Sequence, residues 1–248
     1  MRRFLIEQAP DRKGRLRLHG AEAHHARNVL RLGPGASVVL ADGEGREYLA
    51  RILAVDREGI DLEVLEERPD LAEPRLALTL GLGLLKADRM DLVVQKTTEL
   101  GLKTLVPLRT ARGESRLQGA RAAARLERWN RISRQALKQC RRRQPLEIHA
   151  VTDLAGFLAA SSPADLKIML YEGTEAGPDN WRLICDRRPR PEIIWALVGP
   201  EGGFTPDEVY SARQADFEIL GLGPRILRAE TAALALTSIL GFEFGDFS

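Results

Sequence analysis

Two short glycine-rich segments that each follow an apolar run constrain the fold of this chain most strongly. The first, Gly199–Gly203, follows the run Ile193–Val198, and the second, Gly221–Gly223, follows Ile219 and Leu220. An apolar run that ends in glycines is typical of a buried strand whose backbone then turns or approaches a ligand closely. Two such strand ends predict a ligand cradle made largely of backbone.

The residues after the first segment predict a helix and restrict the ligand. Thr205 is a suitable N-cap, Pro206 suits the first helical position, and Glu208 completes a capping box. Helix N-termini often bind phosphate, but Glu201 and Asp207 add negative charge here, and no Lys-Ser/Thr pair follows as in a P-loop. The loop therefore favours a ligand without phosphate, or a cationic one. A purely structural turn is the alternative.

Composition excludes several classes of protein. A hydrophobic content of 44% and a charged content of 29% are typical of a soluble globular protein. The longest apolar stretches, 76–85 and 232–240, are shorter than the roughly 20 residues that span a bilayer, and the start of the chain does not resemble a secretory signal. Cys140 and Cys185 are expected to be free thiols in a reducing cytoplasm, and the four histidines show no metal-ligand spacing. We expect neither a membrane nor a metal partner.

Turn signals and hydrophobic patterns predict two domains. Residues 1–70 alternate short apolar runs with glycine-containing turns around one helix near 22–30, which is typical of a small β-barrel or sandwich. Residues 74–248 alternate strands with helices, which predicts an α/β domain with a mostly parallel sheet. The expected strands cover 76–84, 104–108, 167–171, 192–198 and 218–220, and the expected helices cover 88–100, 119–142, 154–160, 178–186, 206–215 and 230–241.

Charge is distributed unevenly along the chain. Residues 71–150 carry 17 Lys and Arg against 7 Asp and Glu, a net charge of +10, whereas residues 151–248 carry a net charge of −7. Much of the positive charge forms one face of the helix expected from residue 119, opposite an apolar face. The members of this basic face are Arg121, Arg125, Arg128, Arg131, Arg134, Lys138, Arg141 and Arg142. Arginine suits phosphate contacts, so the face favours RNA binding over plain solvation.

Four segments in order resemble one known family. Gly199–Gly203 and Leu220–Ala233 resemble the C-terminal signature of the RsmE family, and Lys86–Gly101 and His24–Gly35 are similar to its two upstream signatures. This family comprises 16S rRNA uridine N3-methyltransferases of the SPOUT superfamily, which use S-adenosylmethionine. The chain departs from the family pattern within Cys140–Pro145, where Arg141 replaces a glycine and the proline comes one residue early. Arg142 still holds the family's arginine position.

The resemblance implies a fold and partners. It implies a SPOUT-type α/β domain with a C-terminal trefoil knot at 74–248, preceded by a PUA-like β-barrel domain at 1–70 that binds RNA. It implies S-adenosyl-L-methionine as cofactor, 16S rRNA in the small ribosomal subunit as substrate, a homodimer, and a cytoplasmic location. The cofactor residues that it implies are Leu170, Tyr171, Glu172, Gly199, Pro200, Glu201, Gly202, Leu220, Gly221, Leu222, Gly223, Arg225 and Leu227.

Candidate catalytic and RNA-binding residues follow from the same comparison. We expect Arg228, Glu230 and Arg142 to be catalytic and Glu201 to offset the sulfonium charge; an Arg228–Glu230 pair that only caps the last helix is the alternative. His24 and His25 are expected to be structural or to contact rRNA. The expected RNA-binding residues are Arg27, Arg31, Lys86, Arg89, Arg112, Arg116, Arg128, Arg134, Lys138, Arg141 and Arg142.

The sequence therefore predicts an rRNA methyltransferase that acts on N3 of a uridine in the decoding region, on the assembled small subunit. Two alternatives stay open: a ribose 2′-O-methyltransferase of the same superfamily acting on rRNA or tRNA, and a ribosome-assembly RNA-binding protein without catalytic activity. Damaged cofactor loops would indicate the last alternative, and the glycine segments of this chain are intact.

Overall fold

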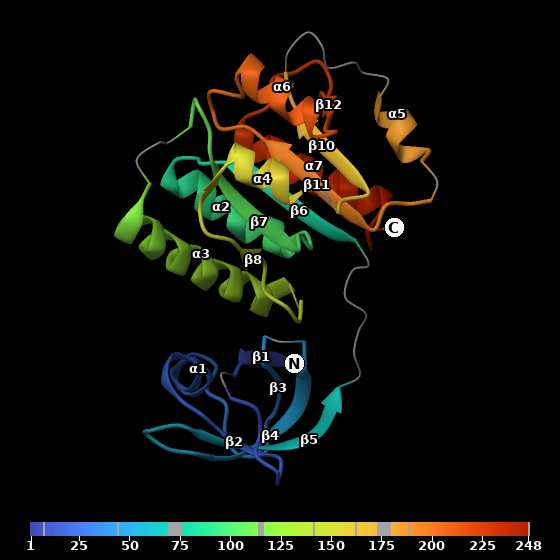
Figure 1. The fold of residues 1–248 in the computed structure, drawn as a ribbon. Helices are drawn as coiled ribbons and strands as arrows, with labels where there is room; N and C mark the ends of the chain where they lie inside the picture. Colours follow the sequence, from blue (N-terminus) through green and yellow to red (C-terminus); the bar gives the residue numbers. More distant parts are fainter. Residues whose placement is uncertain are drawn as a thin grey trace. The chain divides into compact units, whose positions relative to one another are not determined.

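The computed structural model divides the chain into two compact units, which are considered separately (Figure 1). The first unit contains Met1–Glu73 and Leu137–Gln144, and the second contains Pro74–Ala136 and Pro145–Ser248. The structure describes residues 1–6, 8–43, 45–68, 76–113, 117–140, 142–161, 163–172, 180–187 and 189–247. The expected domain boundary at 70–74 lies outside these residues.

The first unit is built on a five-stranded mixed sheet. Its strand order is β1-β3-β4-β5-β2, in which β1 pairs parallel to β3 and every other pairing is antiparallel. Among the described strands no pairing joins β1 to β2, so the sheet is an open half-barrel, where the turn spacing predicted a small β-barrel or sandwich. The strands are β1 (Arg2–Leu5), β2 (Arg15–Leu18), β3 (Ser37–Ala41), β4 (Glu47–Val55) and β5 (Ile60–Arg68).

One short helical segment packs on this sheet. It begins as α1 (Gly20–His24) and continues as a single π-helical turn, His25–Val29. Ala23 and Ala26 from this segment enter a core that includes Phe4 and Leu40. The small side chains let the helical backbone lie close to the sheet, and the polar side chains of the segment are left on its outer side.

A buried arginine ties the segment Leu137–Gln144 to the rest of the first unit. The Arg3 guanidinium lies 2.7 Å from Glu47 Oε1, and both side chains are 7% exposed. Arg3 also donates to the carbonyl oxygens of Leu137, over 3.1 Å, and Arg142. Burial lowers the pKa of Arg3, and the carboxylate of Glu47 opposes that shift. The end of the long helix expected from residue 119 thus belongs to the first unit.

The second unit contains a parallel sheet of seven strands. The order is β12-β10-β11-β6-β7-β8, with β9 also pairing with β7, and every pairing is parallel. Parallel strands require crossover connections, which helices provide here. The strands are β6 (Ala77–Gly83), β7 (Thr104–Arg109), β8 (Glu147–Ile148), β9 (Thr152–Asp153), β10 (Leu166–Leu170), β11 (Ile193–Val198) and β12 (Glu218–Leu220).

Helices cover both faces of this sheet (Figure 1). In β11, Ala196 and Val198 contact one apolar cluster and Leu197 contacts the other, as the two-residue period of a strand requires. The first cluster includes side chains of α2, α3 and α7, and the second includes side chains of α4 and α6. The helices are α2 (Ala87–Glu99), α3 (Gly119–Cys140), α4 (Leu154–Ala160), α5 (Asn180–Cys185), α6 (Pro206–Gln214) and α7 (Ala229–Glu243).

Most expected elements of the second unit are present with ends shifted by a few residues. The strand β1 in the first unit and the strands β8 and β9 were not predicted from the sequence. The strands β8 and β9 have two residues each, too few to show a period. Cys140 and Cys185 are not joined in a disulfide bond. Among the described helices, none is long and apolar enough to cross a membrane.

Candidate functional site

The loops expected to bind the cofactor meet at one edge of the parallel sheet. The carboxyl ends of parallel strands share an edge, where ligands of open α/β sheets usually bind. The Tyr171 backbone N–H, after β10, donates to the carbonyl oxygen of Leu220, at the end of β12, over 2.9 Å. A Cβ atom on Gly203, after β11, would lie 3.6 Å from Glu172 Oε1. The segments after β10, β11 and β12 are therefore neighbours.

The loop after β11 is closely packed against two other strand ends. A Cβ atom on Gly83 would lie 2.4 Å from the backbone nitrogen of Pro200, and one on Gly202 would lie 2.9 Å from Arg112 Cβ. A Cβ atom on Gly199 would meet Phe204 at 3.2 Å. These glycines are needed for contacts within the protein, so close packing alone explains part of this motif.

The capping box predicted for α6 is present, and its glutamate also bonds to the segment after β7. Thr205 Oγ1 accepts from the Glu208 N–H over 3.2 Å, and Glu208 Oε2 accepts from the Thr205 N–H over 2.8 Å. Glu208 Oε1 also accepts from the Ala111 N–H over 2.8 Å, and Arg112 Nη1 donates to the carbonyl oxygen of Gly202 over 3.3 Å. The segment after β7 is thus fixed to the β11 loop. Arg112 is expected from the sequence to bind RNA, but in the structure its guanidinium is hydrogen-bonded to this loop.

The loop after β12 is more open. Gly223 has a φ of 73°, and a Cβ atom on it would meet nothing within 4 Å. Ile226 is 80% exposed, and Arg225 is exposed too. One contact of this loop has no signal in the sequence: Trp181 Nε1, in α5, donates to the carbonyl oxygen of Gly221 over 2.9 Å. Leu222 packs partly against the core, so the exposed part of the loop begins after it.

An arginine between two carboxylates lies where α2, the β11 loop and α7 meet. Arg89 Nη1 donates to Glu201 Oε1 over 3.1 Å, and Arg89 Nε lies 3.9 Å from Glu230 Oε1. The Lys86 backbone N–H also donates to Glu201 Oε1, over 3.4 Å. Three of the four segments that resemble the family therefore each contribute one residue to a charged cluster, Arg89–Glu201–Glu230.

The expected catalytic residues occupy different environments. Glu230 is 9% exposed in the first turn of α7, whereas Arg228 is exposed at the N-cap and makes no side-chain capping hydrogen bond. Glu230 faces Arg89 rather than Arg228, so the structure does not support the alternative in which Arg228 and Glu230 pair to cap the helix. Arg142 belongs to the first unit, where it is half-buried, and its catalytic role stays a prediction.

The expected RNA-binding residues divide into exposed and internally paired side chains. Arg31, Lys86 and Arg134 are exposed. Arg128 Nε donates to Asp91 Oδ2 over 2.9 Å, and this hydrogen bond raises the pKa of Arg128. The other internally bonded residues are Arg27, with the Asp56 carbonyl oxygen, and Lys138, with Glu22. Arg116 and Arg141 lie outside the described residues.

Two smaller expectations concern histidines and a helix cap. His24 is exposed and shares a 2.8 Å hydrogen bond with the Asn28 amide in the π-helical turn, and His25 is exposed as well. Asp88 and Asp91, near the start of α2, suit a helix-capping role by their position in the sequence, but the Asp91 carboxylate pairs with Arg128 of α3. The N-cap of α2 is Lys86, without a side-chain hydrogen bond.

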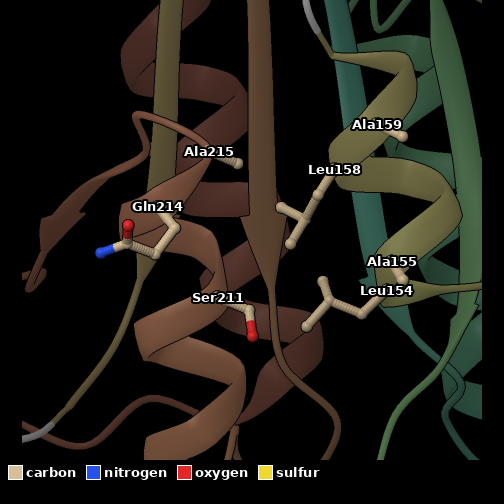
Figure 2. A pocket seen from close by; sticks show the side chains of 7 residues that line it. All are labelled: Leu154, Ala155, Leu158, Ala159, Ser211, Gln214 and Ala215. Atoms are coloured by element: carbon tan, nitrogen blue, oxygen red, sulfur yellow. The ribbon is translucent and has the colours of Figure 1, made fainter.

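A separate hollow lies between α4 and α6, away from the predicted loops (Figure 2). Its volume is about 490 Å³, and Leu154 and Leu158 of α4 point towards α6. The other lining residues are Ala155, Ala159, Ser211, Gln214 and Ala215. None of these seven side chains is ionisable, so the hollow does not suit a charged ligand. Across the residues that the structure describes, no group of three or more potential metal ligands occurs.

Models of known families match both parts of the chain. Residues 72–241 match the RNA methyltransferase domain, and residues 18–65 match the RNA methyltransferase PUA domain. The parallel sheet with converging glycine loops and the preceding mixed sheet thus define an RNA methyltransferase with an N-terminal PUA domain.

Individual relatives identify the family more narrowly. The ribosomal RNA small subunit methyltransferase E of Bacillus subtilis is 29% identical over 240 residues, which cover 96% of this chain and 92% of the relative. The structure of the enzyme of that name from Neisseria gonorrhoeae, bound to S-adenosyl methionine, is 31% identical, with a TM-score of 0.86 and complete coverage of both chains. This chain belongs to the ribosomal RNA small subunit methyltransferase E family, RsmE.

Proposed function

We propose that this protein transfers a methyl group from S-adenosylmethionine to N3 of a uridine in the decoding region of 16S rRNA. The observation that carries the proposal is the match to RsmE relatives along the whole chain, together with cofactor loops that retain their glycines and meet at one sheet edge. The assembled small subunit is the proposed substrate. A cytoplasmic location follows from that substrate.

The loop residues fit this cofactor in shape and charge. The contacts of Gly83 and Gly202 bring backbone from three strand ends together without intervening side chains, which suits recognition of an adenine through backbone groups. Glu172, Glu201 and Glu230 place negative charge around the loops, which suits a ligand with a sulfonium and an ammonium group. The residues proposed to hold the cofactor are those of 170–172, 199–202 and 220–227.

The bound cofactor supplies an electrophilic methyl group, and the protein must align the acceptor and receive its proton. We assign the proton-handling role to the carboxylate of Glu230 and leave Arg228 and Arg142 to stabilise charge on the uracil oxygens. Arg228 is exposed at the start of α7, where its guanidinium is free to meet a substrate.

RNA-binding residues are proposed on each of the two units separately. Arg121, Arg131 and Arg134 are exposed on α3, and Arg31 is exposed beside the π-helical turn. Arginine forks suit phosphate oxygens, and RNA contacts of this kind make affinity fall steeply with salt. The domains are proposed to be 1–70 and 74–248.

Two further features are proposed from the family resemblance. A homodimer would place two active sites beside one interface, and a C-terminal trefoil knot would thread the last helix through a loop of the chain. Sedimentation velocity at micromolar concentration tests the dimer, for which a single monomeric species would be the contrary result. A crystal structure at side-chain resolution tests the knot through the path of the backbone after β12.

Mass spectrometry of the methylated product tests the function. Small subunits and free rRNA from a strain that lacks the enzyme are incubated with the protein and labelled S-adenosylmethionine. The proposal predicts N3-methyluridine in the decoding region and faster transfer to subunits than to free rRNA. Label on a ribose oxygen would favour the 2′-O-methyltransferase alternative, and RNA binding without transfer would favour the assembly protein.

A further inference from the structure

The Arg89–Glu201–Glu230 cluster is placed to organise the reaction rather than to bind RNA. Arg89 lies in the first turn of α2, and its side chain is 31% exposed. Its guanidinium faces Glu201 at 3.1 Å and Glu230 at 3.9 Å. One positive and two negative side chains give the cluster a net charge of −1, so Arg89 has little charge left for a phosphate.

Glu230 has one carboxylate oxygen without a partner. Its side chain is 11% exposed, and Oε1 faces Arg89. Oε2 is buried and accepts no hydrogen bond from any residue that the structure describes. Buried polar atoms are almost always hydrogen-bonded, and the exceptions in native proteins often have a functional reason. This oxygen suits a donor that arrives with a ligand.

We propose that Arg89 is a positioning residue that holds Glu230 so that Oε2 accepts the proton of uracil N3. The inference rests on the proposed function. N3 forms a bond to the methyl carbon, the carbon–sulfur bond breaks with its electron pair left on sulfur, and the N3 proton moves to Oε2. A carboxylate is a sufficient base because N3–H becomes strongly acidic as the new N–C bond forms.

The position of Arg89 explains how the carboxylate is held. Glu201 belongs to the closely packed loop after β11, and its Oε1 is also held by the Lys86 N–H. Arg89 therefore has a fixed neighbour on one side and Glu230 on the other. The guanidinium places a positive charge 3.9 Å from Glu230 Oε1 and so favours one orientation of this carboxylate, which is the role of a residue that acts through another group.

The experiment separates this role from RNA contact with three variants, Arg89→Gln, Arg89→Lys and Glu230→Gln. Single-turnover rates at saturating subunits, cofactor affinity by calorimetry, and RNA affinity across salt concentrations are measured for each. Arg89→Gln is expected to lower the single-turnover rate by about 10²-fold, to weaken cofactor binding several-fold through Glu201, and to leave RNA affinity and its salt dependence unchanged. Arg89→Lys is expected to restore part of the rate.

The control and the pH dependence complete the test. Arg134→Gln, at an exposed position on α3, is expected to weaken RNA binding and reduce the salt slope by about 1. Glu230→Gln is expected to remove the acid limb of the pH–rate profile while it still binds the cofactor. The inference is overturned if Arg89→Gln behaves like Arg134→Gln, or if Glu230→Gln retains both its rate and that limb. If Arg89→Gln does not fold, Arg89→Lys and Glu230→Gln decide by the same measurements.

These results are distinguishable from failure of the proposed function. If the wild-type protein methylates a ribose oxygen, the acceptor in the proposed function is wrong, and the mapped product shows this without any variant. If the wild-type product is N3-methyluridine and both Arg89 variants keep the full single-turnover rate, only the role of Arg89 is wrong.

Discussion

The two glycine loops differ in how far the protein itself fixes them. In the loop after β11, a Cβ atom on Gly202 would lie 2.9 Å from Arg112 Cβ, and a Cβ atom on Gly83 of β6 would lie 2.4 Å from the loop's Pro200 N. The Gly203 N–H donates to the Pro200 carbonyl oxygen over 2.9 Å. In the loop after β12, Gly223 has open space around it and Ile226 is 80% exposed. The first loop is therefore fixed by the protein itself, and we propose that the second loop closes on a ligand.

This difference separates two reasons for a glycine. Gly83 and Gly202 are required because another part of the chain occupies the space of a side chain. Gly223 is required because its φ of 73° is unfavourable for any residue with a Cβ atom. Substitutions at the first kind should reduce stability, and substitutions at the second kind should reduce ligand affinity.

The largest effect is expected for Gly83→Ala. The new Cβ would lie 2.4 Å from Pro200 N and 2.5 Å from Pro200 Cδ, and backbone cannot give way as a flexible side chain can. Thermal or urea unfolding should show a loss of about 3 kcal/mol, together with loss of cofactor binding. Gly33→Ala is the control, because nothing lies within 4 Å of its Cβ position. Equal stability of the two variants would contradict the account of the preformed loop.

A smaller effect, of a different kind, is expected for Gly223→Val. Holding a branched residue in the left-handed conformation costs about 1–2 kcal/mol, and the open surroundings add no collision. Because the loop is open, the free protein can relax out of this conformation, and the strain then returns on binding. Calorimetry should therefore show S-adenosylmethionine affinity reduced by about tenfold, since about 1.4 kcal/mol corresponds to that factor, with little change in the unfolding midpoint. Unchanged affinity would place the cofactor elsewhere.

Trp181→Phe tests the side-chain hydrogen bond from α5 to the second loop. The substitution removes the 2.9 Å hydrogen bond to the Gly221 carbonyl oxygen and keeps an aromatic ring. We expect a loss of about 1 kcal/mol, observed as weaker cofactor binding and faster amide exchange in residues 221–223. If exchange there is unchanged, α5 does not support this loop.

The smallest effect is expected at a turn held by charge rather than by close packing. Hydrogen bonds from Arg17, Gly59 and Glu58 lower the pKa of Asp56 to about 2. Because the folded-state pKa is below the ordinary value, the ionised carboxylate stabilises the turn above about pH 4, and this contribution is lost as the pH falls towards about 2. Unfolding of Asp56→Asn should vary less with pH in that window than unfolding of the wild type. An identical pH dependence would contradict the assignment.

The fold of the second unit could be predicted in most of its elements, because strands and helices there carry strong periodicity. The capping box of Thr205 and Glu208 is confirmed to the level of individual hydrogen bonds, since it depends on residues three apart. The open half-barrel could not be predicted, because sheet closure depends on pairings between distant strands. Short strands such as β8 carry no period at all.

The charged residues of the site were harder to predict than the loops. Arg89 and Arg128 look in the sequence like members of a basic surface, yet each faces a carboxylate from a distant segment. Sequence separation of 112 residues between Arg89 and Glu201 leaves no local signal of that pairing. The basic face of α3 is accordingly smaller than its sequence indicated.

Hydrogen exchange with and without S-adenosylmethionine tests the central claim most directly, namely that the donor binds between a preformed loop and a loop that closes on it. We predict a large gain in protection for the amides of 222–227 and a small gain for those of 199–203, where the Gly203 N–H is already bonded. Equal protection of both loops would contradict the distinction between them. Protection confined to segments outside both loops would contradict the proposed cofactor site.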